Sequence, residues 1–382
     1  MAAPRPFAVQ VPEAVLDDLR QRLDRVRLPD EIPGSGWRYG TDRAYLEALL
    51  RHWRDGYDWR AAERLLNRYP QFTVALGDID LHYVLAEGRG PRPLPLVLSH
   101  GWPGSVWEFH RLIPLLTDPA AHGGDPADAF TVVAPSLPGY AFSFRPGQRR
   151  HAVPEMADVF ASLMADVLGH PRYGAHGGDW GCLVTAALGD RHPGRLAGLH
   201  VTNAFVRPPR AGDLAAHPEV VAYGQRARQW QREEGGYQAI QGTRPQTLAY
   251  ALTDSPAGLA AWLVEKYRAW SDCAGDVERR FSKDVLLTAV TIYWVTGAVN
   301  SSFWPYYAHR HEPWLPSPDA PIAVPTAYAD FPAEIVRPPR VLVERVFDLR
   351  RFTPMAAGGH FAALEEPEAL AADLRAFFRD LR

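Results

Sequence analysis

HGGDWG, residues 176–181, places an aspartate at the centre of a turn flanked by glycines. A strand-like pattern precedes the turn and a helix-like pattern follows it. Small residues on both sides of Asp179 permit a sharp strand-to-helix turn that lifts its side chain out of a sheet, which is how a catalytic nucleophile is presented. The alternative is a plain glycine-rich loop in which Asp179 caps the helix. Taken alone, the stretch leaves both interpretations open.

An upstream loop, HGWPGS at residues 100–105, also follows a predicted strand and precedes a predicted helix. In an α/β-hydrolase this loop supplies one backbone N–H group to an oxyanion hole, and the residue after the nucleophile supplies the other. We therefore expect the backbone N–H groups of Trp102 and Trp180 to be the donors, because Pro103 has no N–H. A turn that merely packs a tryptophan is the structural alternative.

A third stretch, GGHFAALEEP at residues 358–367, places His360 in a loop between a predicted strand and the last helix. This is the position of the last member of a triad in the order nucleophile, acid, histidine. The acid is expected on the loop after the preceding strand, where Asp330 and Glu334 both qualify. Asp348 is a weaker third candidate, and the residues alone do not choose among the three.

The pattern along the chain predicts an α/β fold, with a mostly parallel sheet, helices on both faces and a helical insertion. Residues 1 to about 70 are predicted as mainly helical, and an alternating stretch that follows predicts a β-hairpin turning at Gly77-Asp78. Short apolar strands then alternate with helices, residues 206 to about 315 are mostly helical, and strand signals resume at 321–332 and 350–360. The expected divisions are an N-terminal domain (1–85), the two parts of an α/β-hydrolase core (86–205 and 316–382) and a helical cap (206–315).

The composition narrows the class of protein. The 382 residues carry a net charge of −3 with both signs interspersed, so nothing indicates a nucleic-acid partner. Two cysteines, Cys182 and Cys273, form neither a disulfide framework nor a zinc pattern and suit a reducing compartment. Because no signal peptide or apolar run of membrane-spanning length is evident, we expect a cytoplasmic protein without a membrane partner.

Together these motifs resemble the microsomal-type epoxide hydrolases of the α/β-hydrolase superfamily. The resemblance runs from about residue 5 to the C-terminus and is carried by RPFAVQVPEAVLDDLRQRL, WRYGTDRAYLEALLRHW, HGWPGS, GGDWG, DSPAGLAAWLVEKY and GGHFAALEEPE. The mammalian microsomal members begin with a membrane anchor, whereas this chain begins at the N-terminal domain. In this respect it is similar to the soluble bacterial and fungal members.

The resemblance implies a role for each candidate residue. Asp179 corresponds to the nucleophile and His360 to the base, and the FP-x-E stretch selects Glu334 over Asp330 as the acid. Two cap tyrosines protonate the epoxide oxygen in this family; one corresponds to Tyr237 and the other to Tyr306, although the neighbouring Tyr307 leaves the second assignment open. His176, beside the turn, and Cys182, in the following helix, are interpreted as structural residues.

The expected reaction converts an epoxide and water to a vicinal diol through an ester on Asp179, and it requires no metal or organic cofactor. A small-molecule epoxide is the expected partner, and a homodimer is left open. A haloalkane dehalogenase, which shares the aspartate nucleophile, is the nearest alternative. A catalytically silent α/β-hydrolase scaffold is another, whereas a serine esterase is disfavoured by the missing serine. The sequence does not separate detoxification from a role in natural-product biosynthesis.

Overall fold

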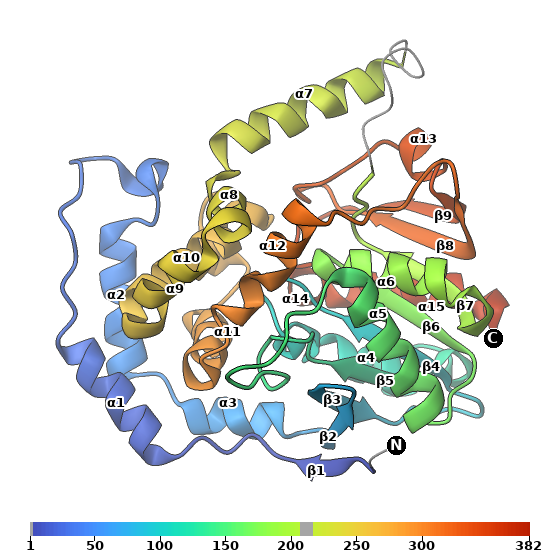
Figure 1. Cartoon of the computed structure of the whole chain (residues 1–382), viewed down its shortest axis with the longest axis horizontal. Helices are drawn as coiled ribbons and strands as arrows, with labels where there is room; N and C mark the ends of the chain where they lie inside the picture. The colour runs from blue at the N-terminus through green and yellow to red at the C-terminus, as the bar shows by residue number, and fades with distance from the viewer. Residues whose placement is uncertain (1–2, 207–216) are drawn as a thin grey trace.

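A nine-stranded sheet forms the centre of the computed structural model, which describes residues 3–206 and 217–382 (Figure 1). The strands follow the order β1-β2-β3-β5-β4-β6-β7-β8-β9. The pairs from β1 to β5 are antiparallel and those from β5 to β9 are parallel, so the prediction of a mostly parallel sheet is confirmed. The strands are β1 (Arg5–Phe7), β2 (Gln71–Leu76), β3 (Ile79–Ala86), β4 (Leu94–Ser99), β5 (Phe130–Pro135), β6 (Tyr173–Gly177), β7 (Leu196–Val201), β8 (Ile322–Asp330) and β9 (Phe347–Pro354).

Helices cover both faces of this sheet. Successive side chains of a strand point to opposite sides, so an apolar strand has two faces that helices can bury. In β4, Leu96 and Leu98 pack into one hydrophobic cluster, whereas Val97 packs into another. The helices on the first side are α4 (Leu112–Thr117) and α15 (Pro367–Phe378). On the other side lie α5 (Val153–Ser162) and α6 (Trp180–Arg191). The central strands are therefore buried on both faces, as expected for parallel strands.

The N-terminal part supplies α1 (Glu13–Asp24), α2 (Arg43–Asp55) and α3 (Trp59–Leu66), followed by the β2–β3 hairpin at the predicted turn. The prediction of a mainly helical start did not include a strand at residues 5–7, which form β1 and pair with β2. A three-residue strand that contains a proline is too short to show an alternating pattern in the sequence. Its formation depends on pairing with the neighbouring strand. The strand expected at 350–360 is also shifted, since β9 spans Phe347–Pro354.

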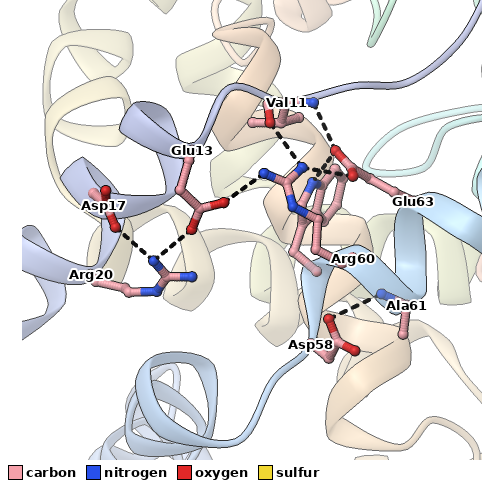
Figure 2. Close-up of polar contacts among 9 residues, drawn as sticks. Val11, Glu13, Asp17, Arg20, Asp58, Arg60, Ala61 and Glu63 are labelled. Atoms are coloured by element: carbon pink, nitrogen blue, oxygen red, sulfur yellow. Dashed lines mark hydrogen bonds and ion pairs between the residues drawn. The ribbon is translucent and has the colours of Figure 1, made fainter.

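A buried carboxylate ties the N-terminal segment to α3 (Figure 2). Glu63 accepts hydrogen bonds from the backbone N–H of Val11 and the indole of Trp59, each at 2.7 Å, and it also pairs with Arg60 at 2.7 Å. Arg60 continues the network by donating to the carbonyl of Val11 and to Glu13. Because a buried carboxylate is stable only when its oxygens are paired, this network fixes the path of the chain into α1.

Most of the described residues in the segment between β7 and β8 are helical. Its helices, which lie to the left of and above the sheet in Figure 1, are α7 (Pro218–Glu233), α8 (Gly236–Thr243), α9 (Pro245–Asp254), α10 (Pro256–Trp270), α11 (Lys283–Thr296) and α12 (Trp304–His311). Two short helices, α13 (Arg340–Val343) and α14 (Ala362–Glu365), flank β9. In the described ranges, no single helix is both long and apolar enough to cross a membrane; α11 reaches that apolar length only jointly with residues 301–311, across a bend of 107°.

Candidate active site

Asp179 lies at the sharp turn between β6 and α6, with φ at 51° and ψ at −129°. A non-glycine residue at positive φ is strained, and such strain is concentrated at functional sites. The flanking glycines permit it: a Cβ on Gly177 would lie 2.2 Å from the carbonyl oxygen of Gly181, and a Cβ on Gly181 would lie 1.9 Å from that of Ser99. Asp179 occupies the N-cap position of α6, but its side chain makes no capping bond to the helix, so capping does not account for the carboxylate.

The loop after β4 brings a hydrogen-bond donor to this turn. The backbone N–H of Trp102 donates to Oδ1 of Asp179 at 2.7 Å. A Cβ on Gly101 would lie only 2.3 Å from Cβ of Asp179, so glycine is what allows this close approach. Trp180 is the first residue of α6, and its N–H therefore belongs to the unpaired N-terminal amides of that helix. Of the two predicted oxyanion donors, Trp102 thus contacts the Asp179 carboxylate, and Trp180 directly follows Asp179 in the chain.

His360 lies on the other side of the Asp179 carboxylate. Its Nε2 is 3.5 Å from Oδ2 of Asp179, and its Nδ1 lies 2.8 and 3.0 Å from the two carboxylate oxygens of Glu334. Glu334 is held in place by the backbone N–H groups of Ile335 and Val336. Burial by itself lowers the pKa of His360, but the negative charges of Glu334 and Asp179 outweigh burial and raise its pKa well above the usual value.

The loop that carries His360 is fixed by a second glutamate, which the sequence analysis did not single out. Glu365 accepts hydrogen bonds from the backbone N–H groups of Phe361 at 3.0 Å and Asp272 at 2.8 Å. The backbone N–H of His360 donates to the carbonyl of Trp270 at 2.9 Å. Glu365 lies in the quoted GGHFAALEEP stretch, but its partner Asp272 is 93 residues away, so no local pattern reveals the contact.

The two other candidate acids are engaged elsewhere. Both carboxylate oxygens of Asp330 accept from the guanidinium of Arg337, at 2.8 and 2.7 Å. Asp348 pairs with Arg350 on the same strand. The structure therefore places Glu334, and neither aspartate, against His360.

Two tyrosines from the helical segment reach the same place. Tyr237 in α8 and Tyr306 in α12 lie 5.7 Å apart between ring centroids, and they line a cavity together with Asp179. Trp102 stacks on Tyr237 at 5.3 Å, and Trp180 meets Tyr306 edge-on at 4.8 Å. Burial first, and then the charge of Asp179, raises the pKa of Tyr237. Burial, followed by the neighbouring Tyr237 and Asp179, raises the pKa of Tyr306. Both phenols therefore keep their protons.

Tyr307 faces away from this group, although it is adjacent to Tyr306 in sequence. Its ring packs on His311 at 4.2 Å, and the guanidinium of Arg150 lies 5.3 Å from its centroid. Tyr307 is not part of the wall of the cavity that contains Asp179. Because neighbouring residues of a helix point about 100° apart, only one of the two tyrosines can face Asp179, and that residue is Tyr306.

The cavity at Asp179 has a volume of about 760 Å³. Its inner wall holds Asp179, Trp180, Tyr237 and Tyr306, and apolar side chains continue it outward, namely Leu183, Phe205, Val206, Trp230 and Leu315. Charged residues of α7 and α12, among them Arg226 and Arg310, lie on its wall as well. In the described part of the chain no cluster of three or more histidine, cysteine or acidic residues could hold a metal ion.

The remaining singled-out residues have structural surroundings. His176 on β6 bonds through Nδ1 to His200 on β7 at 3.0 Å, and Nε2 of His200 lies 3.1 Å from Asp373 of α15. Cys182 is fully buried, and its thiol donates to the carbonyl of Asn203. These contacts join neighbouring strands and the covering helix, and neither side chain lines the cavity.

Comparison with known proteins gives the same family from sequence and from structure. Residues 4–109 match the family model for the epoxide hydrolase N terminus, and residues 95–240 match that for the alpha/beta hydrolase fold. Epoxide hydrolase 1 of Oryctolagus cuniculus is 36% identical, over 98% of this chain and 88% of its own length. The structure of juvenile hormone epoxide hydrolase from Bombyx mori superimposes with a TM-score of 0.90 at 29% identity, over 100% of this chain and 95% of its own. The structure of Aspergillus niger epoxide hydrolase superimposes with a TM-score of 0.88 at 30% identity, over 100% of this chain and 97% of its own. With its fold and its relatives in agreement over almost the whole length, the chain belongs to the epoxide hydrolase family of α/β-hydrolases.

Proposed function

We propose that this chain opens an epoxide with Asp179 and releases a vicinal diol by hydrolysis of the resulting ester. The observation that carries the proposal is the environment of a single carboxylate. Oδ1 of Asp179 accepts the Trp102 N–H at 2.7 Å, and Oδ2 faces Nε2 of His360 at 3.5 Å. The two oxygens therefore have different tasks: Oδ2 attacks the substrate, and Oδ1 becomes the carbonyl oxygen held by the oxyanion donors.

Ring opening needs a proton or a strong hydrogen bond at the epoxide oxygen. Backside attack by Oδ2 on a ring carbon breaks the C–O bond, and the electron pair goes to the oxygen as an alkoxide. Tyr237 and Tyr306 line the cavity opposite Asp179, and both phenols are protonated. We assign them to donate to this oxygen as it becomes charged, so that helices α8 and α12 act as part of a cap.

Ester hydrolysis follows from the charge change on Asp179. An esterified Asp179 is neutral, so it no longer raises the pKa of His360, and His360 can then accept a proton from water. The water oxygen attacks the carbonyl carbon of the ester, and the charge that develops on Oδ1 is bound by the N–H groups of Trp102 and Trp180. Collapse of the tetrahedral intermediate breaks the bond between the carbonyl carbon and the diol oxygen, which takes the proton from His360 as the diol leaves. Glu334 keeps the His360 ring oriented through both steps.

The cavity favours an apolar epoxide of considerable size, since its volume of about 760 Å³ exceeds the needs of a small epoxide. We further propose that residues 206–315 act as the cap, that 86–205 and 316–382 form the core, and that 1–85 form the N-terminal domain. The two cysteines are free and buried, which accords with a reducing cytoplasm. Whether the diol serves detoxification or biosynthesis depends on the substrate.

Haloalkane dehalogenation is the alternative that shares this nucleophile. That reaction needs N–H donors for the departing halide. One such donor is present, because Trp180 lines the cavity. The paired phenols of Tyr237 and Tyr306 favour an oxygen leaving group, because a halide leaves as an anion and needs no proton. A silent scaffold would have no need for a buried charge system around His360.

The purified protein, incubated in parallel with a styrene-type epoxide and with a haloalkane of similar size, tests the proposal. We expect the diol from the epoxide and no halide from the haloalkane. Halide release without diol would assign the alternative. Absence of both, across a panel of aryl and aliphatic epoxides, would support the silent scaffold.

A further inference from the structure

Lys266 is an unusual residue for its position. Only two of the 41 basic Lys and Arg residues of the chain are lysine, Lys266 and Lys283. Lys266 lies in α10 and is 6% exposed, although a buried ammonium is costly unless it is paired. Nothing in the proposed reaction has so far required a cation at this point.

The surroundings of Lys266 connect it to Tyr237. Its Nζ lies 4.9 Å from the centroid of the Tyr237 ring and 5.9 Å from that of Trp270. The neighbouring Glu265 forms an ion pair with the ammonium. The ammonium is thus paired with a carboxylate and also lies near two aromatic rings, and its charge lowers the pKa of a second carboxylate, Glu234, although burial raises that pKa overall. A cation at less than 6 Å from an aromatic centroid is attracted by the electrons of the ring, most strongly where water is excluded.

A cation at this place changes what Tyr237 can do. Burial first, and then the charges of Asp179 and Glu334, raise the pKa of Tyr237 and oppose any transfer of its proton. When the phenol donates to a developing alkoxide, negative charge spreads into the ring. The attraction between Lys266 and the ring then grows, so the cation stabilises the transition state of ring opening more than the resting enzyme.

We propose that Lys266 is a positioning residue that strengthens Tyr237 as a proton donor during epoxide ring opening. The inference rests on the proposed function of Tyr237. It also makes a distinction between the two chemical steps: the charge on the phenol changes when the ring opens, whereas hydrolysis of the Asp179 ester is driven by His360. Loss of the ammonium therefore slows the first step and leaves the second unchanged.

The chain offers a matched control in its other lysine. Lys283 lies 5.7 Å from the ring centroid of Tyr45 and pairs with Glu278, but Tyr45 is not part of the cavity wall. Lys283→Met removes the same kind of contact at a distance from the reaction. Lys266→Arg keeps the positive charge over the ring, and Lys266→Gln serves as a second neutral variant if Lys266→Met does not fold.

Rapid-mixing kinetics on these variants measure ester formation and ester hydrolysis separately. We expect Lys266→Met to slow ester formation about tenfold and hydrolysis by less than about twofold. Lys266→Arg should recover most of the loss, and Lys283→Met should match the parent protein. Equal slowing of both steps, an unchanged rate of ester formation, or the same loss in Lys283→Met would overturn the proposal.

The effect of Lys266 on Tyr237 can also be measured without substrate, so it can be tested independently of the proposed reaction. A polyfluorinated tyrosine at position 237, whose ring fluorines make the phenol much more acidic, brings the pKa of that phenol into the range in which the protein stays folded, and fluorine NMR then follows it. We expect Lys266→Met to raise this pKa and Lys283→Met to leave it unchanged; an unchanged value in Lys266→Met would overturn the role of Lys266. If the parent protein forms no ester at all, the proposed function fails, while the NMR titration still decides whether Lys266 acts on Tyr237.

Discussion

Trp102 and Asp179 are separated by 77 residues in the sequence, yet the backbone N–H of Trp102 lies 2.7 Å from Oδ1 of Asp179. The contact joins the loop after β4 to the turn after β6, two neighbouring parallel strands. It distinguishes the two carboxylate oxygens of Asp179, the proposed nucleophile, before any substrate binds. Binding of a ground-state carboxylate oxygen at this place means that the site for the oxyanion already exists in the resting protein.

Gly101→Ala should damage this contact with little effect on the rest of the fold. The new Cβ would lie 2.3 Å from both Cβ and Oδ1 of Asp179, so either the carboxylate or the Trp102 amide must move. Loss of one oxyanion donor typically slows an enzyme by about 10²- to 10³-fold, and we expect kcat for diol formation to fall by that factor. Gly194→Ala, where a Cβ meets open space, is the control. Equal activity of the two variants would show that the contact is dispensable.

His360→Gln should stop the reaction after its first step. Without a base the ester on Asp179 is not hydrolysed, so one equivalent of substrate is consumed and turnover ceases. Mass spectrometry of the intact protein should show the added mass of the epoxide, on a peptide that contains Asp179. Continued turnover at more than a few per cent of the parent rate would mean that another group activates the water.

Substitution of the two cavity tyrosines, Tyr237 and Tyr306, should affect the reaction, whereas substitution of the adjacent Tyr307 should not. We expect Tyr237→Phe and Tyr306→Phe each to slow ring opening by about 10²-fold, because each removes one of two donors to the alkoxide. Tyr307→Phe should retain the parent rate, since the Tyr307 ring packs on His311 outside the cavity wall. Single-turnover rates of ester formation provide the comparison. A loss in Tyr307→Phe that exceeds the loss in Tyr306→Phe would reverse the assignment.

Asp373 should contribute to stability in a pH-dependent manner. Burial raises its pKa, but hydrogen bonds from His200, Arg351 and Thr353 outweigh burial and lower the pKa to about 2, from 3.8. Because the folded-state pKa lies below the unfolded value, the stabilisation is present above about pH 4 and is lost as the pH falls towards 2. Asp373→Asn should therefore lower the free energy of unfolding by about 2 kcal/mol at pH 7.

Urea unfolding of the parent protein and Asp373→Asn between pH 7 and the acid limit of folding tests this linkage. The difference in the free energy of unfolding should be constant down to about pH 4 and shrink below it. A difference that stays constant to the lowest accessible pH would show that the carboxylate of Asp373 is not the titrating group.

Local patterns were sufficient to predict the catalytic turns. A glycine-flanked aspartate between strand-like and helix-like stretches permits a tight turn that larger side chains would block, and the structure shows the expected strand-to-helix turn with Asp179 at positive φ. The histidine loop and the hairpin at residues 77–78 were predicted for the same reason. In each case the glycines permit a tight turn that is formed within a few residues, so the local sequence is enough to predict it.

Contacts between distant segments could not be predicted in this way. The residues alone left Glu334 and Asp330 equivalent, and the choice depends on Arg337, which binds Asp330. The choice of Tyr306 over Tyr307 depends on how α12 rotates against Trp180. The contact of Lys266 with Tyr237 joins α10 to α8 and has no signature in either stretch. The family resemblance supplied Glu334, Tyr237 and Tyr306, and the packing of α12 separates Tyr306 from Tyr307.

A single turnover in water enriched in oxygen-18 tests the central claim, that Asp179 itself attacks the epoxide. The protein is used in excess over a styrene-type epoxide, and both the diol and the peptide that contains Asp179 are analysed by mass spectrometry. If Oδ2 of Asp179 opens the ring, the diol of the first turnover carries no heavy oxygen and the label appears in the Asp179 carboxylate. A labelled diol beside an unlabelled peptide would show that water attacks the epoxide directly, and the account given for Asp179 would be wrong.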